Sequence, residues 1–504
     1  MNINVHIARL MLAVALFAAM AWQQELGAAA RATQKSAKRI TSGSKRNTST
    51  SGRTTSTSRR VSNASKSKSK SGRTRKKRRA RVRIVSTAIT KLNVVLEKEM
   101  SPGVRYVEYR SNGKQAINVH TITYDRTIPG NALRLVKGMD QSDGLERLSD
   151  MSKRYGSATG HSIHGIVNGN FWRAYRNTPI GPSVIDGEVV EMNAYKRWSS
   201  AFVDVKNELT IDTFSISGSL LWSGHTFQIA SVNRRIDSGV VVYNAFGGST
   251  VPNVSARDVQ QAFQEALKDT VFSNADSTET ALSQERLRLE IAAAQRESNV
   301  EYPLMKVRVR YLRSPAVNVP LQCQVLDADT GTVDIPLRGA VFSFPRGAFA
   351  PGARPRSGDT ITILFKTNVM STTRFMNAVC GTPRIVRNGV ARLEATKEGS
   401  TGGRFIGHNL ARTAVGVDKS GTKIILACVE SAQGQSNTIG ATLQQTAEIM
   451  RLLGSYHALN LDGGGSSGML IDGDHVFFDG EDPLTRRISV GLAIVRLSHV
   501  LRTR

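Results

Sequence analysis

The chain has 504 residues, which is enough for two or more domains, and a formal net charge of +28 at pH 7. Residues 31–83 contain 20 Lys and Arg residues and no Asp or Glu, so residues 84–504 carry a net charge of only +8. The net charge of residues 84–504 is therefore too small to indicate that they bind nucleic acid. The three cysteines are too few and too scattered for a disulfide framework or a zinc site. We expect all three to be small buried residues, Cys323, Cys380 and Cys428.

The first 30 residues have the pattern of a signal peptide. One basic residue, Arg9, precedes an apolar run at 10–22, and small residues then place the expected cleavage after Ala28 or Ala30. The apolar run is about two-thirds of the roughly 20 residues that a membrane-spanning helix needs. We therefore predict an exported protein, secreted or held in the periplasm or cell envelope, with no transmembrane segment after cleavage.

Residues 31–83 are rich in Ser, Thr, Lys and Arg and have almost no large apolar side chains. Such a segment cannot bury enough surface to offset the entropy lost on ordering, so we predict that it is disordered. Its densest charge, at 73–83, suits an anionic surface such as a phosphorylated envelope polymer, lipid headgroups or nucleic acid. A solvated tether without a partner explains the same composition, and this alternative stays open.

From about residue 84 the sequence changes to short β-rich runs separated by turn signals. Hairpin turns are predicted at Asp186-Gly187 and Asn388-Gly389, each of which lies between apolar segments. Residues 256–298 differ, because they are highly charged, follow a helical pattern and contain no Gly or Pro. We interpret residues 84–504 as one domain that carries a helical insertion at about 256–298.

The clearest local pattern lies in the C-terminal third. Residues 423–429 read as a strand, Thr442 opens a helix with Gln445 in a capping-box position, and Gly454 ends it before a second strand at 458–461. Strand-helix-strand units favour parallel pairing. The predicted fold class is therefore α+β (mixed α/β), with a central mixed β-sheet, flanking helices and the helical insertion.

A glycine-rich loop follows that second strand, starting at Asp462 and continuing as Gly-Gly-Gly-Ser-Ser-Gly to residue 468. Glycines let backbone N–H groups approach a ligand and form an anion-binding nest, and the two serine hydroxyls add donors. A nucleotide P-loop is excluded because its lysine is absent and a strand, not a helix, follows. The loop therefore suits a phosphate or a crowded sugar.

Five segments, in this order, resemble those of the phosphodiester glycosidase family. They are Val-Asn-Gly-Asn-Phe-Trp at 167–172, Ile-Gly-Pro-Ser-Val-Ile-Asp-Gly at 180–187, Ala-Val-Cys-Gly-Thr-Pro-Arg-Ile-Val-Arg-Asn-Gly at 378–389, Arg-Thr-Ala-Val-Gly-Val at 412–417 and Asn-Leu-Asp-Gly-Gly-Gly-Ser-Ser at 460–467. The resemblance runs from about 168 to 495 and is interrupted by the insertion. It implies an exported hydrolase that cleaves a sugar from a sugar-1-phosphodiester in a glycan or envelope polymer.

The sequence departs from the family pattern at several positions. Asn170 replaces a glycine, Ala411 a proline and Gly468 a threonine. Where the family usually has Asp-Gly-Arg, this chain has Glu430 followed by Ser-Ala-Gln, so the carboxylate is present and the arginine is absent. These changes leave the reaction class in place and the identity of the substrate open.

Cleavage of a sugar from a phosphodiester needs a carboxylate at the anomeric carbon and an anion site for the phosphate. We assign Asp462 as the leading catalytic carboxylate and Glu430 as its partner. Arg412 would clamp the phosphate, because its planar fork matches two phosphate oxygens. The predicted substrate-binding residues are Asn168, Gly169, Arg412, Thr413, Gly463, Gly464, Gly465, Ser466 and Ser467.

Simpler roles remain open for these side chains. Arg412 would form a buried ion pair that orders the sheet, Asn168 would be a turn residue, and Asp462 would be a cap or turn residue. The chemistry requires no cofactor, although a divalent cation at Asp462 stays possible. Four histidines are expected to be scattered polar or packing residues, His161, His164, His408 and His457.

Two other functions compete with the enzyme. A non-catalytic envelope or polysaccharide-binding protein on the same scaffold is supported by the arginine missing after Glu430. A specific nucleic-acid-binding protein rests on net charge alone, and we do not expect specific nucleic acid as a partner.

Overall fold

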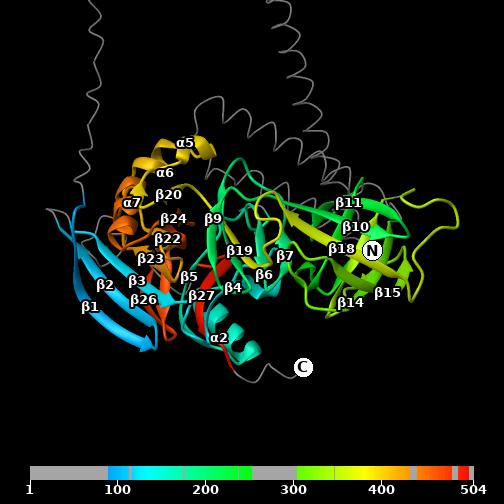
Figure 1. The fold of residues 1–504 in the computed structure, drawn as a ribbon, viewed down its shortest axis with the longest axis horizontal. Helices are drawn as coiled ribbons and strands as arrows, with labels where there is room; N and C mark the ends of the chain where they lie inside the picture. Colours follow the sequence, from blue (N-terminus) through cyan, green and yellow to red (C-terminus); the bar gives the residue numbers. More distant parts are fainter. Residues whose placement is uncertain are drawn as a thin grey trace, which may run out of the picture. The chain divides into compact units, whose positions relative to one another are not determined.

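The computed structural model describes residues 89–112, 116–173, 176–236, 238–251, 304–345, 347–431, 440–478 and 486–498. The expected signal peptide, the basic segment at 31–83 and the helical insertion at 256–298 lie outside the described residues. The described residues all belong to one compact unit, which is built mainly of β-strands (Figure 1).

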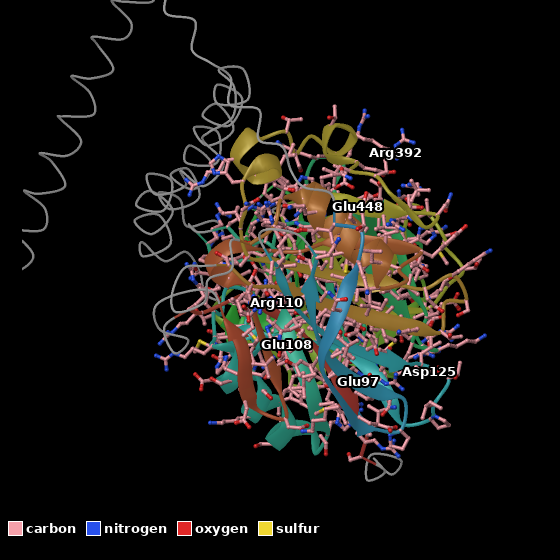
Figure 2. The ribbon with its side chains drawn as sticks, turned by 90° about the vertical axis from the view of Figure 1, so that its left-hand side faces the viewer. Glu97, Glu108, Arg110, Asp125, Arg392 and Glu448 are labelled. Carbon is pink, nitrogen blue, oxygen red and sulfur yellow. The ribbon has the colours of Figure 1, made fainter. Side chains whose placement is uncertain are left out.

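An eight-stranded sheet, here called the large sheet, contains most of the strands that carry the predicted site. In spatial order its strands are β1 (Leu92–Ser101), β2 (Val104–Ser111), β3 (Asn118–Asp125), β23 (Lys423–Val429), β22 (Arg412–Val417), β24 (His457–Asn460), β20 (Arg384–Arg387) and β21 (Val390–Ala391). β1 is the outer edge strand, and Figure 2 looks onto it, with Glu97 on the strand and Glu448 above it. Strands far apart in the sequence are thus neighbours in this sheet.

Two five-stranded sheets pack against the large sheet. The second sheet has the order β26 (Asp474–Phe478), β25 (Gly468–Ile471), β5 (Ser162–Asn168), β27 (Val490–Arg496) and β4 (Asn131–Lys137). The third sheet has the order β7 (Glu188–Glu191), β6 (Ser183–Ile185), β19 (Phe375–Gly381), β8 (Ser199–Asp204) and β9 (Leu209–Asp212). Apolar side chains of all three sheets, such as Leu426, Val167 and Val203, meet in one core cluster.

A closed barrel with its own core forms the remaining large element. Its strands are β10 (Ile216–Trp222), β11 (His225–Val232), β12 (Val240–Tyr243), β17 (Gly339–Phe344), β14 (Met305–Tyr311), β15 (Leu321–Asp329) and β18 (Thr360–Thr367). A two-stranded sheet joins β13 (Thr250–Val251) to β16 (Val333–Asp334). The predicted insertion therefore falls between β13 and β14 in the chain.

Helices are few and short among the described residues. They are α2 (Leu148–Thr159), α5 (Ala395–Glu398), α6 (Gly403–Gly407) and α7 (Leu443–Leu452). α7 packs on the large sheet, where Ile425 and Ala427 face its Ala447 and Met450, while the alternate residue Leu426 faces the other two sheets. This alternation explains why residues 424–429 are apolar throughout, since this part of the strand is covered on both faces. No helix among the described residues has the length and apolar character needed to cross a membrane.

Several local predictions are confirmed. The capping box of α7 is present, with Thr442 accepting from the Gln445 backbone N–H and the Gln445 side chain accepting from the Thr442 N–H. The Asp186-Gly187 and Asn388-Gly389 turns connect β6 to β7 and β20 to β21, and all four residues have the positive φ that such hairpins need. The three cysteines are buried and unbridged.

The predicted fold class is wrong. The described chain is mostly β, with a closed barrel and several sheets, and it is not a central mixed α/β sheet with flanking helices. The strand-helix-strand unit does exist, but β22 lies between β23 and β24 and is antiparallel to both. In the part of the chain that the structure describes, only β11 and β12 pair in parallel. The single strand-helix-strand unit therefore did not predict the antiparallel pairing of the large sheet.

Candidate active site

The predicted site residues gather where strands of two sheets end. In the large sheet, Arg412 pairs with Val429 and Val429 pairs with Val119, so the start of β22, the end of β23 and the start of β3 share one edge. β24 ends at this same edge, and Asp462 follows two residues later. The second sheet contributes Asn168, the last residue of β5.

Asn168 connects the glycine loop to both sheets. Its side-chain Nδ2 donates to the backbone oxygen of Asp462 at 2.7 Å. Its Oδ1 accepts from the Thr413 hydroxyl at 2.6 Å and from the Gly468 N–H at 3.3 Å. Asn168 is only 1% exposed. Its buried side chain therefore holds the first and last residues of the loop, Asp462 and Gly468, by hydrogen bonds.

The glycine loop itself is tightly bonded to its surroundings. Asp462 N donates to Gly169 O at 3.0 Å, and Gly464 N donates to Ala411 O at 2.9 Å. The N–H groups of Gly463, Ser466, Ser467 and Gly468 also donate within the protein. Most of the loop's N–H groups are therefore already satisfied, and an open nest of free amides does not form here.

Two loop glycines have steric reasons to lack a side chain. A Cβ at Gly463 would lie 3.0 Å from the backbone oxygen of Ala411. A Cβ at Gly465 would lie 2.4 Å from Nη2 of Arg486, so the absence of a side chain leaves room for that guanidinium. Arg486 is exposed and its charge acts on Asp462. Arg486 could not be assigned to the site from the sequence, because an arginine 24 positions after Asp462 carries no local signal.

The surroundings of Asp462 raise the pKa of its carboxyl group. Burial raises its pKa to about 6, although hydrogen bonds from the Ser466 hydroxyl and the Gly463 N–H, together with the charge of Arg486, act in the opposite direction. The carboxyl therefore exchanges its proton close to neutral pH, as a general acid or base needs.

Arg412 is placed differently from a simple phosphate clamp. Its Nε donates to Ala441 O at 3.0 Å, and its Nη2 donates to Phe405 O and His408 O at 2.8 and 3.0 Å. Arg412 as a whole is 1% exposed, its guanidinium lies over the Phe405 ring, and burial lowers its pKa to about 10. No carboxylate forms an ion pair with it among the described residues, so it holds the chain at 405–412 through carbonyl groups.

Glu430 lies at the same sheet edge in a polar cluster with two residues of β3 that could not be predicted from the sequence. Its Oε1 is 2.7 Å from His120 Nε2, and its Oε2 accepts from Asn118 Nδ2 at 3.0 Å. The Glu430 side chain is 14% exposed and that of His120 is 4% exposed. The alternation of side chains along β3 places His120 on the face that packs against the other sheets. No local sequence signal connects it to Glu430, because the two residues are 310 positions apart.

The four histidines named from sequence have separate surroundings. His164 bonds to Ser101 and His161 to Ser498, and the backbone oxygen of His408 accepts from Arg412. Burial and the neighbouring Arg384 lower the pKa of His457 to about 4, so its neutral ring accepts at Nδ1. None of these four side chains joins the Asn168 network.

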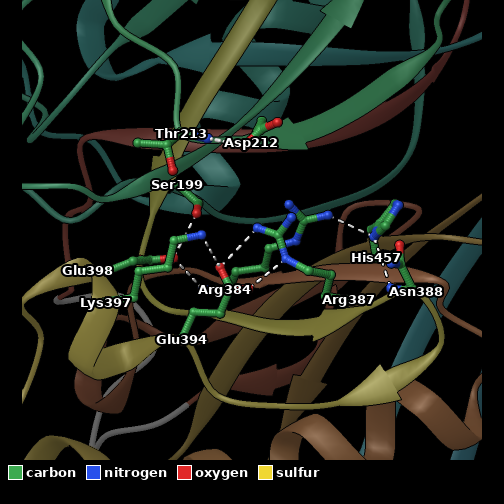
Figure 3. Close-up of polar contacts among 10 residues, drawn as sticks. All are labelled: Ser199, Asp212, Thr213, Arg384, Arg387, Asn388, Glu394, Lys397, Glu398 and His457. Carbon is green, nitrogen blue, oxygen red and sulfur yellow. Dashed lines mark hydrogen bonds and ion pairs between the residues drawn. The ribbon is translucent and has the colours of Figure 1, made fainter.

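His457 belongs to a second polar cluster, which links the large sheet to the third sheet (Figure 3). Arg384 donates to it through Nη2 at 2.7 Å, and Glu398 accepts from Arg384 N at 2.9 Å and from the Ser199 hydroxyl at 2.6 Å. The hydrogen bonds across the sheets identify this cluster as a structural connection. Across the described residues, no group of three or more His, Cys, Asp and Glu is arranged to hold a metal ion.

Comparisons with known proteins agree with the motif resemblance. A sequence model of the phosphodiester glycosidase family matches residues 335–495. The N-acetylglucosamine-1-phosphodiester alpha-N-acetylglucosaminidase of Bos taurus is 32% identical over 128 residues, which are 23% of this chain and 24% of that enzyme. The Homo sapiens enzyme of the same name is 29% identical over 128 residues, with the same shares. The match thus spans about a quarter of the length of these curated relatives.

A solved structure extends the similarity to the fold. A hypothetical protein from Synechocystis superimposes with a TM-score of 0.53 at 18% identity, covering 81% of this chain and 64% of that chain. At this identity the similarity concerns the fold alone. The family model begins at residue 335, so the segments at 167–172 and 180–187 lie outside its match, although Asn168 reaches the glycine loop.

The raised pKa of Asp462 predicts a pH-dependent contribution to stability. The folded protein holds this proton more tightly than the unfolded chain, so the contribution is complete below about pH 4 and is lost as pH rises through about 6. Asp462→Asn should remove it, and the free energy of unfolding of wild type relative to the variant should fall by on the order of 2 kcal/mol from pH 4 to pH 7. Denaturant unfolding at several pH values measures this, with the exposed Asp474→Asn as control. A difference that is constant across pH would contradict the assignment.

Proposed function

We propose that this chain is a hydrolase that cleaves a sugar from a sugar-1-phosphodiester, with a glycan or envelope polymer as the substrate; the match of a phosphodiester glycosidase family model to residues 335–495 supports the proposal. The observation that carries the proposal is the position of Asp462, a carboxyl with a pKa of about 6, on a glycine loop that the buried Asn168 holds in place. Glu430 lies at the same edge of the large sheet.

The two carboxyl groups suit different parts of one hydrolysis. The bond that breaks joins the anomeric carbon to the bridging oxygen, and water supplies the new hydroxyl on the sugar. Glu430 accepts hydrogen bonds on both oxygens, as an ionised carboxylate does, and takes the proton of the attacking water. Asp462 supplies a proton to the bridging oxygen as the phosphate monoester leaves. The proposed chemistry requires no cofactor.

We assign the phosphate to Arg486, with Arg412 in a supporting role. Nε and Nη2 of Arg412, one edge of the fork that would grip two phosphate oxygens, already donate to backbone oxygens. Arg486 lies over Gly465, is exposed, and places a positive charge next to Asp462. Arg412 then fixes the backbone beside the loop, where Ala411 O binds Gly464 N. Ser466 and Ser467 supply hydroxyl groups at the same loop.

A non-catalytic glycan-binding protein on the same scaffold is the alternative function. The arginine missing after Glu430 supports it. The raised pKa of Asp462 favours the enzyme, because a group that only binds a glycan has no need of a proton that exchanges near neutral pH. A protein that binds sugar phosphodiesters without turnover would establish the alternative.

Substitutions of Asp462 and Arg486 should impair the enzyme in different ways. Asp462→Asn should lower kcat by a factor on the order of 10² or more while substrate still binds, because the carboxyl acts in the transition state. Arg486→Gln should raise KM for a sugar-1-phosphodiester by about tenfold, as expected when a charged hydrogen bond to phosphate is lost.

Arg487→Gln is the matched control, since it removes an exposed positive charge from the adjacent position and should leave both constants unchanged. Steady-state kinetics on sugar-1-phosphodiesters measure kcat and KM of each variant, with aryl glycosides and simple phosphodiesters as parallel substrates. Equal effects of the two arginine substitutions would remove Arg486 from the site. Wild-type kcat in Asp462→Asn would remove the carboxyl from the mechanism.

We also propose that the protein is exported and that residues 31–83 hold it on an anionic surface, because 20 positive charges stand there without an acidic residue. Deletion of 31–83 should abolish binding to anionic vesicles or a phosphorylated polymer and leave turnover of a small substrate unchanged. Binding of the full chain should weaken steeply with salt. Co-sedimentation at several salt concentrations tests this, and salt-independent binding or loss of small-substrate activity would contradict it.

A further inference from the structure

A hydrogen-bonded chain of three side chains leads from the interior to Glu430. The hydroxyl of Tyr106 on β2 is 2.8 Å from Nδ1 of His120 on β3, and Nε2 of the same ring is 2.7 Å from Glu430 Oε1. His120 therefore uses both ring nitrogens, one toward a neutral phenol and one toward a carboxylate. Asn118, two residues earlier on β3, bonds to the other carboxylate oxygen at 3.0 Å.

The direction of these hydrogen bonds follows from the groups at the two ends. Burial, with the nearby charges of Glu108 and Glu430, raises the pKa of Tyr106 to about 12, so the phenol keeps its proton. When the imidazole is neutral, the phenol donates to Nδ1 and the ring proton is on Nε2, facing Glu430. When the imidazole is charged, the hydroxyl rotates and accepts from Nδ1, and Nε2 still donates to Glu430. Either way the carboxylate keeps its donor.

Packing fixes the plane of the imidazole. The His120 ring lies nearly parallel to the rings of Tyr106 and of Phe477 in β26, with centroid distances of 6.2 and 5.9 Å and interplanar angles of 10° and 4°. In the sheet, Glu108 and Cys428 are the register partners of His120 on its two neighbouring strands. Burial raises the pKa of the Cys428 thiol to about 12, so it is uncharged at neutral pH. Among the described residues of β3, its neighbouring strands and β26, the charged groups placed toward the imidazole are therefore Glu430 and Glu108.

We propose that Tyr106 and His120 are positioning residues that hold Glu430 as an oriented, ionised carboxylate at the sheet edge next to the glycine loop. The inference rests on the proposed function of Glu430 as the base that takes a proton from water. A carboxylate that keeps two donors is held in one rotamer and stays ionised over a wider pH range. Glu430 lies just after the end of a strand. The hydrogen bonds from Tyr106 to His120 and from His120 to Glu430 thus orient its carboxylate.

His120→Phe tests this directly, because it keeps an aromatic ring between Tyr106 and Phe477 and removes both nitrogens. The variant should stay folded, lose kcat/KM by a factor on the order of 10², and show the acid limb of its pH profile at higher pH, since the carboxylate has lost a donor. His120→Gln, whose amide again offers an N–H near the Nε2 position, should recover much of the loss. Tyr106→Phe should show a smaller shift in the same direction.

A double-mutant cycle with Glu430→Gln separates positioning from packing. If His120 acts through Glu430, then His120→Phe should have little further effect on kcat/KM in a Glu430→Gln background. His225→Phe, at an exposed histidine in the barrel, is the control and should match wild type.

The outcomes separate the inference from the proposed function. A pH profile and kcat/KM of His120→Phe that superimpose on wild type, while Glu430→Gln is impaired, would overturn the inference and leave the proposed function in place. Additive losses from the two substitutions would also overturn it. A wild-type protein that turns over none of the sugar phosphodiesters would overturn both.

Discussion

The buried side chain of Asn168 is the connection on which the candidate site depends. One amide joins the end of β5 in the second sheet to the backbone of Asp462, to the hydroxyl of Thr413 on β22 and to the N–H of Gly468. It is almost completely buried, so each lost bond would leave a polar atom without water. The glycine loop therefore has a fixed start and a fixed end, and Asp462 is held where these two sheets, which share one apolar core, meet.

The arrangement of charges follows from this geometry. Asp462 is held in a confined place, which raises its pKa, while Glu430 lies at the sheet edge with hydrogen-bond donors on both oxygens. Two carboxyl groups in such unequal surroundings are suited to opposite proton-transfer roles. The positive charges are also divided. Arg412 is enclosed by carbonyl groups and fixes the backbone, whereas Arg486 is exposed over the loop and available to an anion.

Features set by neighbouring residues could be predicted from the sequence. The capping box at Thr442, the Asp186-Gly187 turn and the apolar strand at 423–429 each depend on a few consecutive residues, and all three are confirmed. The glycine loop could be recognised from its own residues, whereas Asn168 and Thr413 were assigned to the site from the family resemblance, and the structure joins both to this loop. The fold class was wrong, because nothing in residues 423–461 indicates that β22 would lie between the two strands of the crossover.

The parts of the site that could not be predicted are those that join distant segments. His120 and Glu430 are 310 positions apart, and a histidine in an alternating strand looks the same whether it binds a carboxylate or packs in a core. Arg486 lies in a polar stretch, and only the absent side chain of Gly465 explains its position. Arg412 was expected to grip a phosphate, but burial turns a guanidinium toward the nearest carbonyl groups when no anion is close.

The central claim is that water attacks the sugar and not the phosphorus. Hydrolysis of a sugar-1-phosphodiester in H₂¹⁸O decides this, because the oxygen of water enters only the fragment whose bond is broken by attack. Mass spectrometry of the phosphate monoester is the most direct reading, since its oxygens do not exchange with water under these conditions. The account predicts a phosphate monoester free of ¹⁸O, and a monoester that carries one ¹⁸O atom would contradict it.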